Sequence, residues 1–370
     1  MSIDPDTAKD LMASFDEHYE ELQRALNKLI HQPDDIELIN LIFRSIHTIK
    51  GNASMVQLME LVEFSHGIEE TVAAIRNENF PPTPQVCDLM LTGTDRLRDL
   101  HKFYLYDKPF ESFNETEVAE GFKEISTATS AQDAEERVTK LYRILYPEAA
   151  GTGISTDDTF SIENVADHAS YLECDEAALQ DLALFRELSR QTDSQNDFWH
   201  GRTDKLVYMG VKLCQLSTEI EINNTQLVAG IYMHDTGMAF LPYELINKQS
   251  KLNPMEFKKL KKHVDWGHAI VARIPGWEEA ATMILQHHEQ EDGSGYPAGL
   301  TSEQLSEGAK IISILDAFYA MTNLRSDRSH RRSVLRAVSE INACSGTQFN
   351  KYWVELFNQL IKSEVKNGNL

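Results

Sequence analysis

Apolar residues recur every three or four positions along most of this chain, the spacing of a helix with one buried face. The pattern is sharpest in the first third, where Pro33 and the pair Pro81–Pro82 interrupt it. It predicts helices at 4–30, 34–54, 58–78 and 84–105, with Asp34 and Thr83 as caps. Four amphipathic helices joined by short turns favour a four-helix bundle over residues 1–108.

The periodicity weakens between residues 109 and 174, where small and polar residues surround one short apolar piece. We interpret this stretch as a partly helical connector. Helical spacing returns over residues 175–370, with no alternating strand pattern and no repeat of fixed period. The sequence therefore predicts an all-α protein with two helical domains.

The composition and charge of the chain disfavour some classes of binding partner. With 370 residues and a formal net charge of −23, the chain disfavours nucleic acid and anionic lipid, which attract clustered Lys and Arg. We expect no membrane insertion and a cytoplasmic location, because no apolar run approaches the ~20 residues of a spanning helix and the first residues are acidic. Four scattered cysteines favour reduced thiols over disulfides or a zinc ribbon.

The stretch FRSIHTIKGNA in the second predicted helix places His47 at the edge of the apolar face. A histidine that accepts a phosphoryl group needs an exposed ring nitrogen, a nearby cation and open space. Lys50 supplies the charge and Gly51 removes a side chain, although glycine within a helix costs about 0.5–1 kcal/mol relative to alanine. The ordinary alternative is a half-exposed histidine beside a helical lysine.

This stretch, together with EFSHGIEE, resembles the histidine phosphotransfer (HPt) domain in the form found in chemotaxis-type kinases. The resemblance implies that His47 is the phosphoacceptor and that Lys50 and Gly51 support it. His31 and His66 lack the lysine and glycine that follow His47, so we interpret them as structural. Because the chain has no glycine-rich nucleotide box, the expected phosphodonor is a separate sensor histidine kinase or receiver domain.

Histidines and acids also gather in five apolar pieces of the second half: FWHGR, IYMHDTG, LKKHVDWG, HHEQEDGSGYP and ILDAFYA. Buried imidazoles and carboxylates are costly unless they neutralise one another or share a cation. Imidazole with carboxylate suits first-row metals, of which we favour Fe or Mn, with Ni, Co and Zn as alternatives. Seven such groups exceed the needs of one ion and favour a pair, as in two-metal hydrolases of phosphodiesters.

The order of these pieces resembles the HD-GYP domain, a branch of the HD phosphohydrolases that hydrolyses cyclic di-GMP. The resemblance implies two metal ions, with Asp235 as their bridge and with Asp235 and His234 in catalysis. It also implies that Gly295, Tyr296 and Pro297 form a loop at the mouth of the site and that Arg325 and Arg328 approach the substrate phosphates. The implied metal ligands are His200, His234, Asp235, His263, His287, His288 and Asp316.

The sequence departs from the family pattern at four positions. Asn196 stands where members with three metals carry a glutamate, and Met238 replaces a lysine expected near the scissile phosphate. Tyr319 replaces an acid and Lys310 an arginine. Because asparagine is a weaker and neutral ligand, we expect two metals rather than three. We expect the missing cation near the phosphate to reduce turnover, with a shift toward another cyclic dinucleotide as the alternative.

Three functions remain open at this stage. The first is a metal-dependent phosphodiesterase that converts cyclic di-GMP to linear pGpG and GMP and is coupled to phosphorylation of His47. The second is an adaptor that binds a cyclic dinucleotide or a protein in a phosphorelay without appreciable turnover. The third, hydrolysis of another phosphorylated nucleotide, fits the intact Gly295–Tyr296–Pro297 segment less well.

Overall fold

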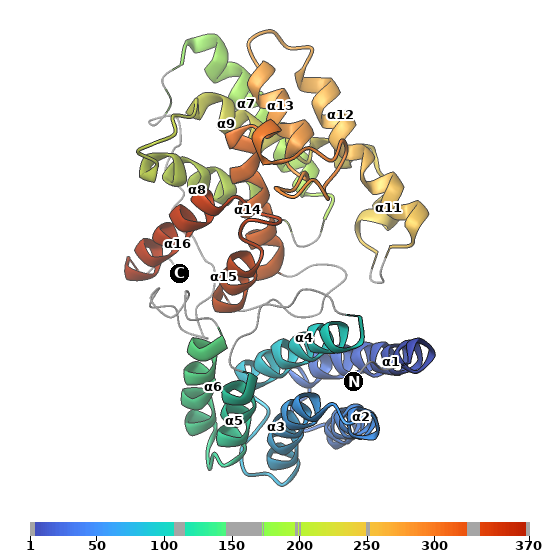
Figure 1. Cartoon of the computed structure of the whole chain (residues 1–370). Coiled ribbons are helices and arrows are strands. Elements are labelled where there is room, and N and C mark those ends of the chain that lie inside the picture. Colours follow the sequence, from blue (N-terminus) through green and yellow to red (C-terminus); the bar gives the residue numbers. More distant parts are fainter. Residues whose placement is uncertain are drawn as a thin grey trace. The chain divides into compact units, whose positions relative to one another are not determined.

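The computed structural model describes residues 4–106, 115–145, 172, 174–196, 199, 201–248, 252–323 and 334–367. The chain divides into two compact units, one containing α1–α6 and the other α7–α16 (Figure 1). Within these residues the only β-type pairings are two isolated bridges, Asp292–Thr301 and Ser345–Phe349. The predicted all-α class is confirmed.

The first unit opens with the four expected helices: α1 (Pro5–Leu29), α2 (Ile36–Met55), α3 (Met59–Arg76) and α4 (Pro84–Tyr106). Their bounds lie within two residues of the predicted ones. Thr83 caps α4 as expected, with its hydroxyl accepting from the Val86 backbone N–H at 3.4 Å. The prediction of Asp34 as a cap is wrong by one residue, because the Asp35 carboxylate accepts from the N–H groups of Glu37 and Leu38.

Two further helices, α5 (Glu115–Ser126) and α6 (Ala131–Leu145), lie within the stretch that we expected to be a connector. They pack on the bundle, α5 against α3 and α6 against α4 and α5. Gly67 allows the first contact, because a Cβ there would lie 2.6 Å from the carbonyl oxygen of Ala119. The buried Tyr142 hydroxyl donates to Asp88 at 2.8 Å and ties α6 to α4.

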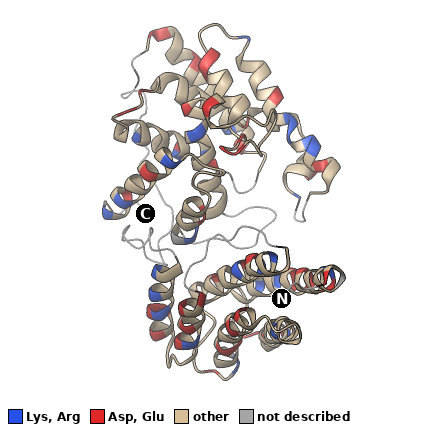
Figure 2. Ribbon diagram, in the orientation of Figure 1, with Lys and Arg blue, Asp and Glu red and all other residues tan. Residues whose placement is uncertain are grey.

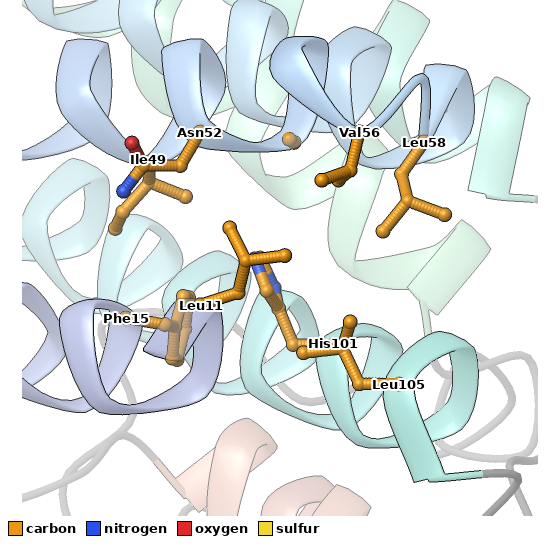
Figure 3. Close-up of a pocket in the computed structure, with 9 residues that line it drawn as sticks. Leu11, Phe15, Ile49, Asn52, Val56, Leu58, His101 and Leu105 are labelled. Atoms are coloured by element: carbon orange, nitrogen blue, oxygen red, sulfur yellow. The ribbon is translucent and has the colours of Figure 1, made fainter. Parts of the chain in front are cut away.

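A small pocket remains between α1, α2 and α4 of this unit (Figure 3). Leu11 and Phe15 of α1 face Ile49 and Asn52 of α2 across it. His101 of α4 also lines the pocket, and its ring lies 4.1 Å from that of Phe15, centroid to centroid. A nearly buried imidazole therefore takes part in the core of the first unit.

The second unit is a helical bundle with two short 3-10 turns. Its core is formed by α8, α9, α13 and α14, and α7, α12 and α16 pack around them. The elements are α7 (Glu176–Asp193), α8 (Arg202–Leu216), α9 (Asn224–Met233), η3 (Thr236–Phe240), α10 (Tyr243–Ile246), α11 (Pro254–Leu260), α12 (Lys262–Val271), α13 (Glu278–Gln286), η4 (Ser302–Gln304), α14 (Glu307–Thr322), α15 (Val334–Ala343) and α16 (Lys351–Lys366).

A close approach between η3 and α12 determines where the acids and histidines of this unit meet. A Cβ at Gly237 would clash with the backbone carbonyl of His263, so only glycine permits this spacing. Gly237 follows His234 and Asp235 by a few residues. The glycine of the HDTG segment therefore brings Asp235 and His263 together.

Charges of both signs are distributed over the described residues of both units (Figure 2). Figure 2 shows Lys and Arg interspersed with Asp and Glu on most helices, with a lysine cluster on α11 and the start of α12. No helix among the described residues combines the length and apolar character that crossing a membrane requires.

Candidate functional site

His47 lies on the exposed face of α2, with its side chain 65% exposed. Its Nδ1 is 2.6 Å from the Oε1 of Glu69 on α3. The other oxygen of Glu69 accepts from the Lys50 ammonium and lies 3.3 Å from the Nδ1 of His66. One carboxylate, only 8% exposed, therefore gathers two histidines and a lysine from two helices.

Glu69 controls which ring nitrogen of His47 can react. Burial by itself would raise the pKa of Glu69, but the hydrogen bonds from Lys50 and His47 outweigh it and the net pKa is lowered. An ionised carboxylate accepts only, so Nδ1 of His47 carries the proton and Nε2 keeps its lone pair. Nε2 is then the ring nitrogen whose lone pair is available for reaction.

The surroundings of His47 are open on the side of Gly51. A Cβ built at Gly51 would have no atom within 4 Å. The ring of Phe43 stacks beside His47 at 6.1 Å, and the guanidinium of Arg76 lies 3.9 Å above the Phe43 ring. Sequence reasoning did not identify Glu69 and treated His66 as structural, whereas the two residues share the hydrogen-bonding cluster around His47.

Six acids and histidines of the second unit come from four separate segments and meet at one place. Asp235, His263, His287 and His288 offer ligand atoms that all lie within 4.8 Å of one another, and so do His234, Asp235 and Asp316. His234 and His287 cap the carboxyl ends of α9 and α13, His263 lies in the first turn of α12, and Asp316 lies within α14. Asp235 belongs to both groups.

Three of the histidines are oriented in the same way. The Nδ1 atoms of His234, His263 and His287 each lie 2.7 Å from the backbone carbonyl three residues earlier in the chain. A ring nitrogen that donates to a carbonyl leaves the opposite nitrogen, Nε2, as an acceptor or ligand. The helix ends therefore direct three Nε2 lone pairs into the cluster.

The carboxylate of Asp235 lies between the two groups with one oxygen toward each. Its Oδ1 is 3.2 Å from Nε2 of His263 and 3.9 Å from Nε2 of His287. Its Oδ2 is 3.5 Å from Nε2 of His234 and 2.8 Å from the Arg202 guanidinium. Each oxygen of this carboxylate therefore faces a different group of ligand atoms.

The first group fits a metal ion. Oδ1 of Asp235 and the Nε2 atoms of His263 and His287 are buried and make no hydrogen bond within the described residues. Buried polar atoms without a partner are costly, and a shared cation would satisfy all three. One carboxylate oxygen with three imidazoles is a donor set suited to a first-row transition metal.

The protonation of the first group also suits a cation. Burial and the neighbouring histidines lower the pKa of His287 well below its usual value, and burial lowers that of His288 to about 4. Burial would raise the pKa of Asp235, but Arg202 and His234 outweigh it and hold the pKa well below its usual value. Burial alone would lower the pKa of His263, but its contact with Asp235 raises it, so a metal ion would displace a proton from this ring. The neutral rings of His287 and His288 and the ionised carboxylate of Asp235 are the forms that bind metals.

The second group contains a cation that sequence reasoning did not weigh. Nη2 of the buried Arg202 lies 2.8 Å from Nε2 of His234 and donates to Oδ1 of Asp316 at 2.5 Å. Its Nη1 lies 2.8 Å from Oδ2 of Asp235. The sequence signal that could have indicated this cation was Arg202 itself, at the end of the FWHGR segment.

The loop that follows His288 is organised by Glu289. Its buried carboxylate accepts from the backbone N–H groups of Ala298, Gly299 and Leu300 at 2.6, 3.2 and 3.0 Å. Gly295 lies against the backbone of Glu289, where a Cβ would clash. The sequence presented Glu289 as one acid of a chemical cluster, but its contacts are structural.

This loop forms one wall of an open cleft of about 570 Å³ above the cluster. Tyr296 lines the cleft, with its ring 4.8 Å from that of His288 and the Lys261 ammonium 4.4 Å from the Tyr296 ring. Pro297 is exposed beside it. The remaining lining residues are Trp199, Arg202, Asp235, Met238, Leu260, Asp316, Tyr319, Ala320 and Asn323.

The remaining residues that the sequence analysis singled out are either not described by the structure or do not belong to the cluster of ligand atoms. His200, Arg325 and Arg328 lie outside the described residues. Met238 and Tyr319 line the cleft, so the two departures from the family pattern face the expected substrate position. Lys310 pairs with Glu307 at 2.7 Å on its own helix. Asn196 is buried.

Comparison with known proteins identifies both units. Residues 7–100 match the family model of the Hpt domain, and residues 187–351 match that of an HD domain. Over 228 residues the chain is 27% identical to a cyclic di-GMP phosphodiesterase of Thermotoga maritima, covering 61% of this chain and 59% of the relative.

Two other relatives match one unit or the other. A 3'3'-cGAMP-specific phosphodiesterase 1 of Vibrio cholerae is 28% identical over 146 residues, covering 38% of this chain and 33% of the relative. Sensor histidine kinase CheAY of Helicobacter pylori is 32% identical over 136 residues, covering 36% of this chain and 17% of the relative. Each match spans less than two thirds of the relative's length. This chain joins an Hpt domain to an HD domain of the HD-GYP type.

Proposed function

We propose that this chain is a signalling protein in which an Hpt domain accepts a phosphoryl group on His47 and an HD-GYP domain hydrolyses cyclic di-GMP. The hydrolytic products are linear pGpG and then GMP. The phosphodonor is a sensor histidine kinase or a receiver domain, and both reactions take place in the cytoplasm. Phosphorylation of the first unit would then be coupled to hydrolysis by the second.

The observation that carries the hydrolase is the set of unpartnered atoms below the open cleft. Asp235, His263 and His287 present buried ligand atoms that lack hydrogen bonds, and His288 completes the group. These four side chains would hold a divalent ion, which we expect to be Fe or Mn. Such an ion would supply Lewis acidity toward an oxygen of the phosphodiester.

The chain's own residues have defined tasks in this proposal. The Nδ1–H bonds of His263 and His287 keep each ring in the tautomer that presents Nε2. Tyr296 offers an aromatic face at the wall of the cleft, next to Lys261. A guanine base stacks on such a face, and the ammonium adds positive charge near a phosphate.

The support for a cyclic dinucleotide over other phosphodiesters is the kinship with cyclic di-GMP and cGAMP phosphodiesterases. The HHE and GYP segments lie together at the cleft, because Glu289 holds the loop that carries Tyr296. Met238 lines the cleft in place of the lysine expected from the family pattern. We therefore expect slower turnover than in a member that has this lysine.

The test of the hydrolase uses the full chain loaded with Mn²⁺ and offered cyclic di-GMP, with 3'3'-cGAMP as a second substrate. Formation of pGpG that is lost in His263→Ala supports the proposal. His268→Ala is the matched control, since His268 lies on the same helix but its Nδ1 bonds to the carbonyl of Ala281, away from the cluster. Tight binding without any linear product would instead favour the adaptor.

The test of the phosphoacceptor uses a histidine kinase or phosphorylated receiver domain as donor. Label from the donor should enter the wild-type chain and the His31→Gln variant but not His47→Gln. Label that persists in His47→Gln would remove this residue from its role. The two tests are independent, because one reads label on the first unit and the other reads a product of the second.

A further inference from the structure

We propose that this chain binds one divalent metal ion, at Asp235, His263, His287 and His288, and that the guanidinium of Arg202 takes the position of a second ion between His234, Asp235 and Asp316. The inference rests on the metal requirement of the proposed function but not on the identity of the phosphodiester. It differs from the pair of ions that the sequence predicts.

The two groups of ligand atoms differ in whether they are already occupied. In the first group, Nε2 of His263 and Nε2 of His287 have no hydrogen-bond partner. In the second group, Nε2 of His234 faces an N–H of Arg202 at 2.8 Å. Among the described residues, Nε2 of these histidines, the atom that would bind a metal, therefore makes no hydrogen bond in the first group and faces Arg202 in the second.

The chemistry of Arg202 determines which atom of its contact with His234 is the hydrogen-bond acceptor. A guanidinium donates and never accepts, so Nε2 of His234 must be the acceptor in this pair. Nδ1 of His234 already donates to the carbonyl of Ile231 at 2.7 Å, which leaves Nε2 with a single lone pair. A metal ion and Arg202 therefore compete for the same lone pair.

Of the two carboxylates of the second group, Asp316 accepts a hydrogen bond from Arg202 and Asp235 forms an ion pair with it. Oδ1 of Asp316 accepts from Nη2 of Arg202 at 2.5 Å, and Oδ2 of Asp235 lies 2.8 Å from Nη1. The guanidinium thus contacts one atom of each of the three described residues of the second group. Each of these contacts uses an atom that a metal ion in this position would otherwise bind.

Arg202 is held where it stands rather than swung in from the surface. Its side chain is 3% exposed, and it belongs to the first turn of α8. Its guanidinium lies 4.7 Å from the centroid of the Trp199 ring and 5.9 Å from that of Tyr319. Moving it away would break these contacts and leave a buried charge unpaired.

Charge balance favours one ion as well. Three carboxylates surround the guanidinium, those of Asp235, Asp316 and, at 3.9 Å, Asp193. Arg202 and one divalent ion balance these three negative charges. A second divalent ion in the place of Arg202 would leave one positive charge uncompensated and would separate the buried guanidinium from its carboxylates, which is unfavourable.

The experiment is a metal count on the full chain after dialysis against Mn²⁺, followed by mass spectrometry of the metal and by electron paramagnetic resonance. We expect one Mn²⁺ per wild-type chain, with the spectrum of an isolated ion. Arg202→Ala should bind two ions that show the exchange coupling of a bridged pair. Arg186→Ala is the matched control and should bind one, because Arg186 pairs with Asp204 away from the cluster.

A second variant decides the question if Arg202→Ala does not fold, which circular dichroism would show. Asp316→Asn should still bind one ion, because Asp316 contacts Arg202 and not the metal. Two ions in the wild type that fall to one in Asp316→Asn would overturn the inference, as would a folded Arg202→Ala that binds only one. A wild-type chain that binds no more Mn²⁺ than His263→Ala would contradict the proposed metal requirement itself.

Discussion

Nδ1 of His47 lies 2.6 Å from Oε1 of Glu69, so the exposed histidine of one helix is oriented by a buried carboxylate of the next. The same carboxylate holds Lys50, the residue that the sequence assigns to offset the phosphoryl charge. The proposed phosphoacceptor and its cation are therefore positioned by a third residue. Glu69 is a positioning residue, since it reaches the reacting nitrogen only through the ring.

Glu69→Gln should slow phosphorylation of His47 on the order of tenfold or more, because the neutral amide no longer favours the proton on Nδ1. The measurement is the initial rate of phosphoryl incorporation from a donor kinase. A positioning role also predicts that the pH at which the rate is half-maximal moves in the variant. Glu63→Gln, on the exposed side of α3, is the control and should match wild type. An unchanged rate in Glu69→Gln would show that His47 reacts without this contact.

Sequence reasoning found the residues whose chemistry is unusual and missed those whose role comes from their surroundings. His234, Asp235, His263, His287, His288 and Asp316 were identified because imidazole and carboxylate in apolar segments need a reason. Arg202 and Glu69 were not, because arginine and glutamate are ordinary on helices, and Glu289 was noted only as one acid of the HHE segment. Their roles appear only when remote segments bury them.

The helices, too, were predicted correctly where the sequence pattern is strong and missed where it is weak. The bundle of the first unit was predicted to within two residues because strong periodicity defines its ends. α5 and α6 were not recognised as part of that unit, because their apolar faces are short and lie between polar stretches. Their position depends on contacts such as Gly67 with Ala119, which join residues far apart in the chain.

His101 should make the stability of the first unit sensitive to acid. Burial lowers the pKa of His101 to about 4, although its bond to the Leu97 carbonyl and the charge of Asp16 oppose the shift. In the unfolded chain a histidine has a pKa near ~6.5. The unfolded state then binds more protons, so stability is fully present above about pH 6.5 and is lost as the pH falls toward 4.

This predicts a loss of roughly 3 kcal/mol or less from the first unit between pH 7 and pH 4, by the usual conversion of a pKa shift into free energy. The measurement is urea unfolding of the full chain across this range, compared with His101→Gln. The glutamine cannot titrate, and its amide can still donate to Leu97. The variant should therefore lose less stability in acid. Parallel pH profiles for the two proteins would exclude His101 as the cause.

Gly237→Ala should separate η3 from α12. Its Cβ would clash with the backbone carbonyl of His263, so the chain must shift there, at a cost of about 1–3 kcal/mol or more. The shift would also increase the distance between Asp235 and His263, and we expect a lower Mn²⁺ content. Calorimetry and metal analysis of the full chain measure the two effects.

Gly51→Ala is the matched glycine variant for this prediction. Its Cβ would meet no atom within 4 Å, so the helix should gain about 0.5–1 kcal/mol. Opposite signs for the two substitutions would show that the effect at Gly237 comes from the close approach and not from the loss of a glycine. Equal stability of Gly237→Ala and wild type would mean that the two segments are not held as tightly as described.

Glu289→Gln should loosen the loop that carries Tyr296 without removing a metal ligand. Its carboxylate accepts from three backbone N–H groups, and bonds to a charged acceptor contribute about 1.5–3 kcal/mol each. A neutral amide has one acceptor oxygen and would leave at least one of these N–H groups poorly satisfied. We expect the KM for cyclic di-GMP to rise several-fold while the Mn²⁺ content stays at the wild-type level. Glu303→Gln, exposed in η4, should change neither value. If Glu289→Gln lost the metal together with substrate affinity, the carboxylate would have to be assigned to the metal centre, and the separation between ligands and loop would not hold.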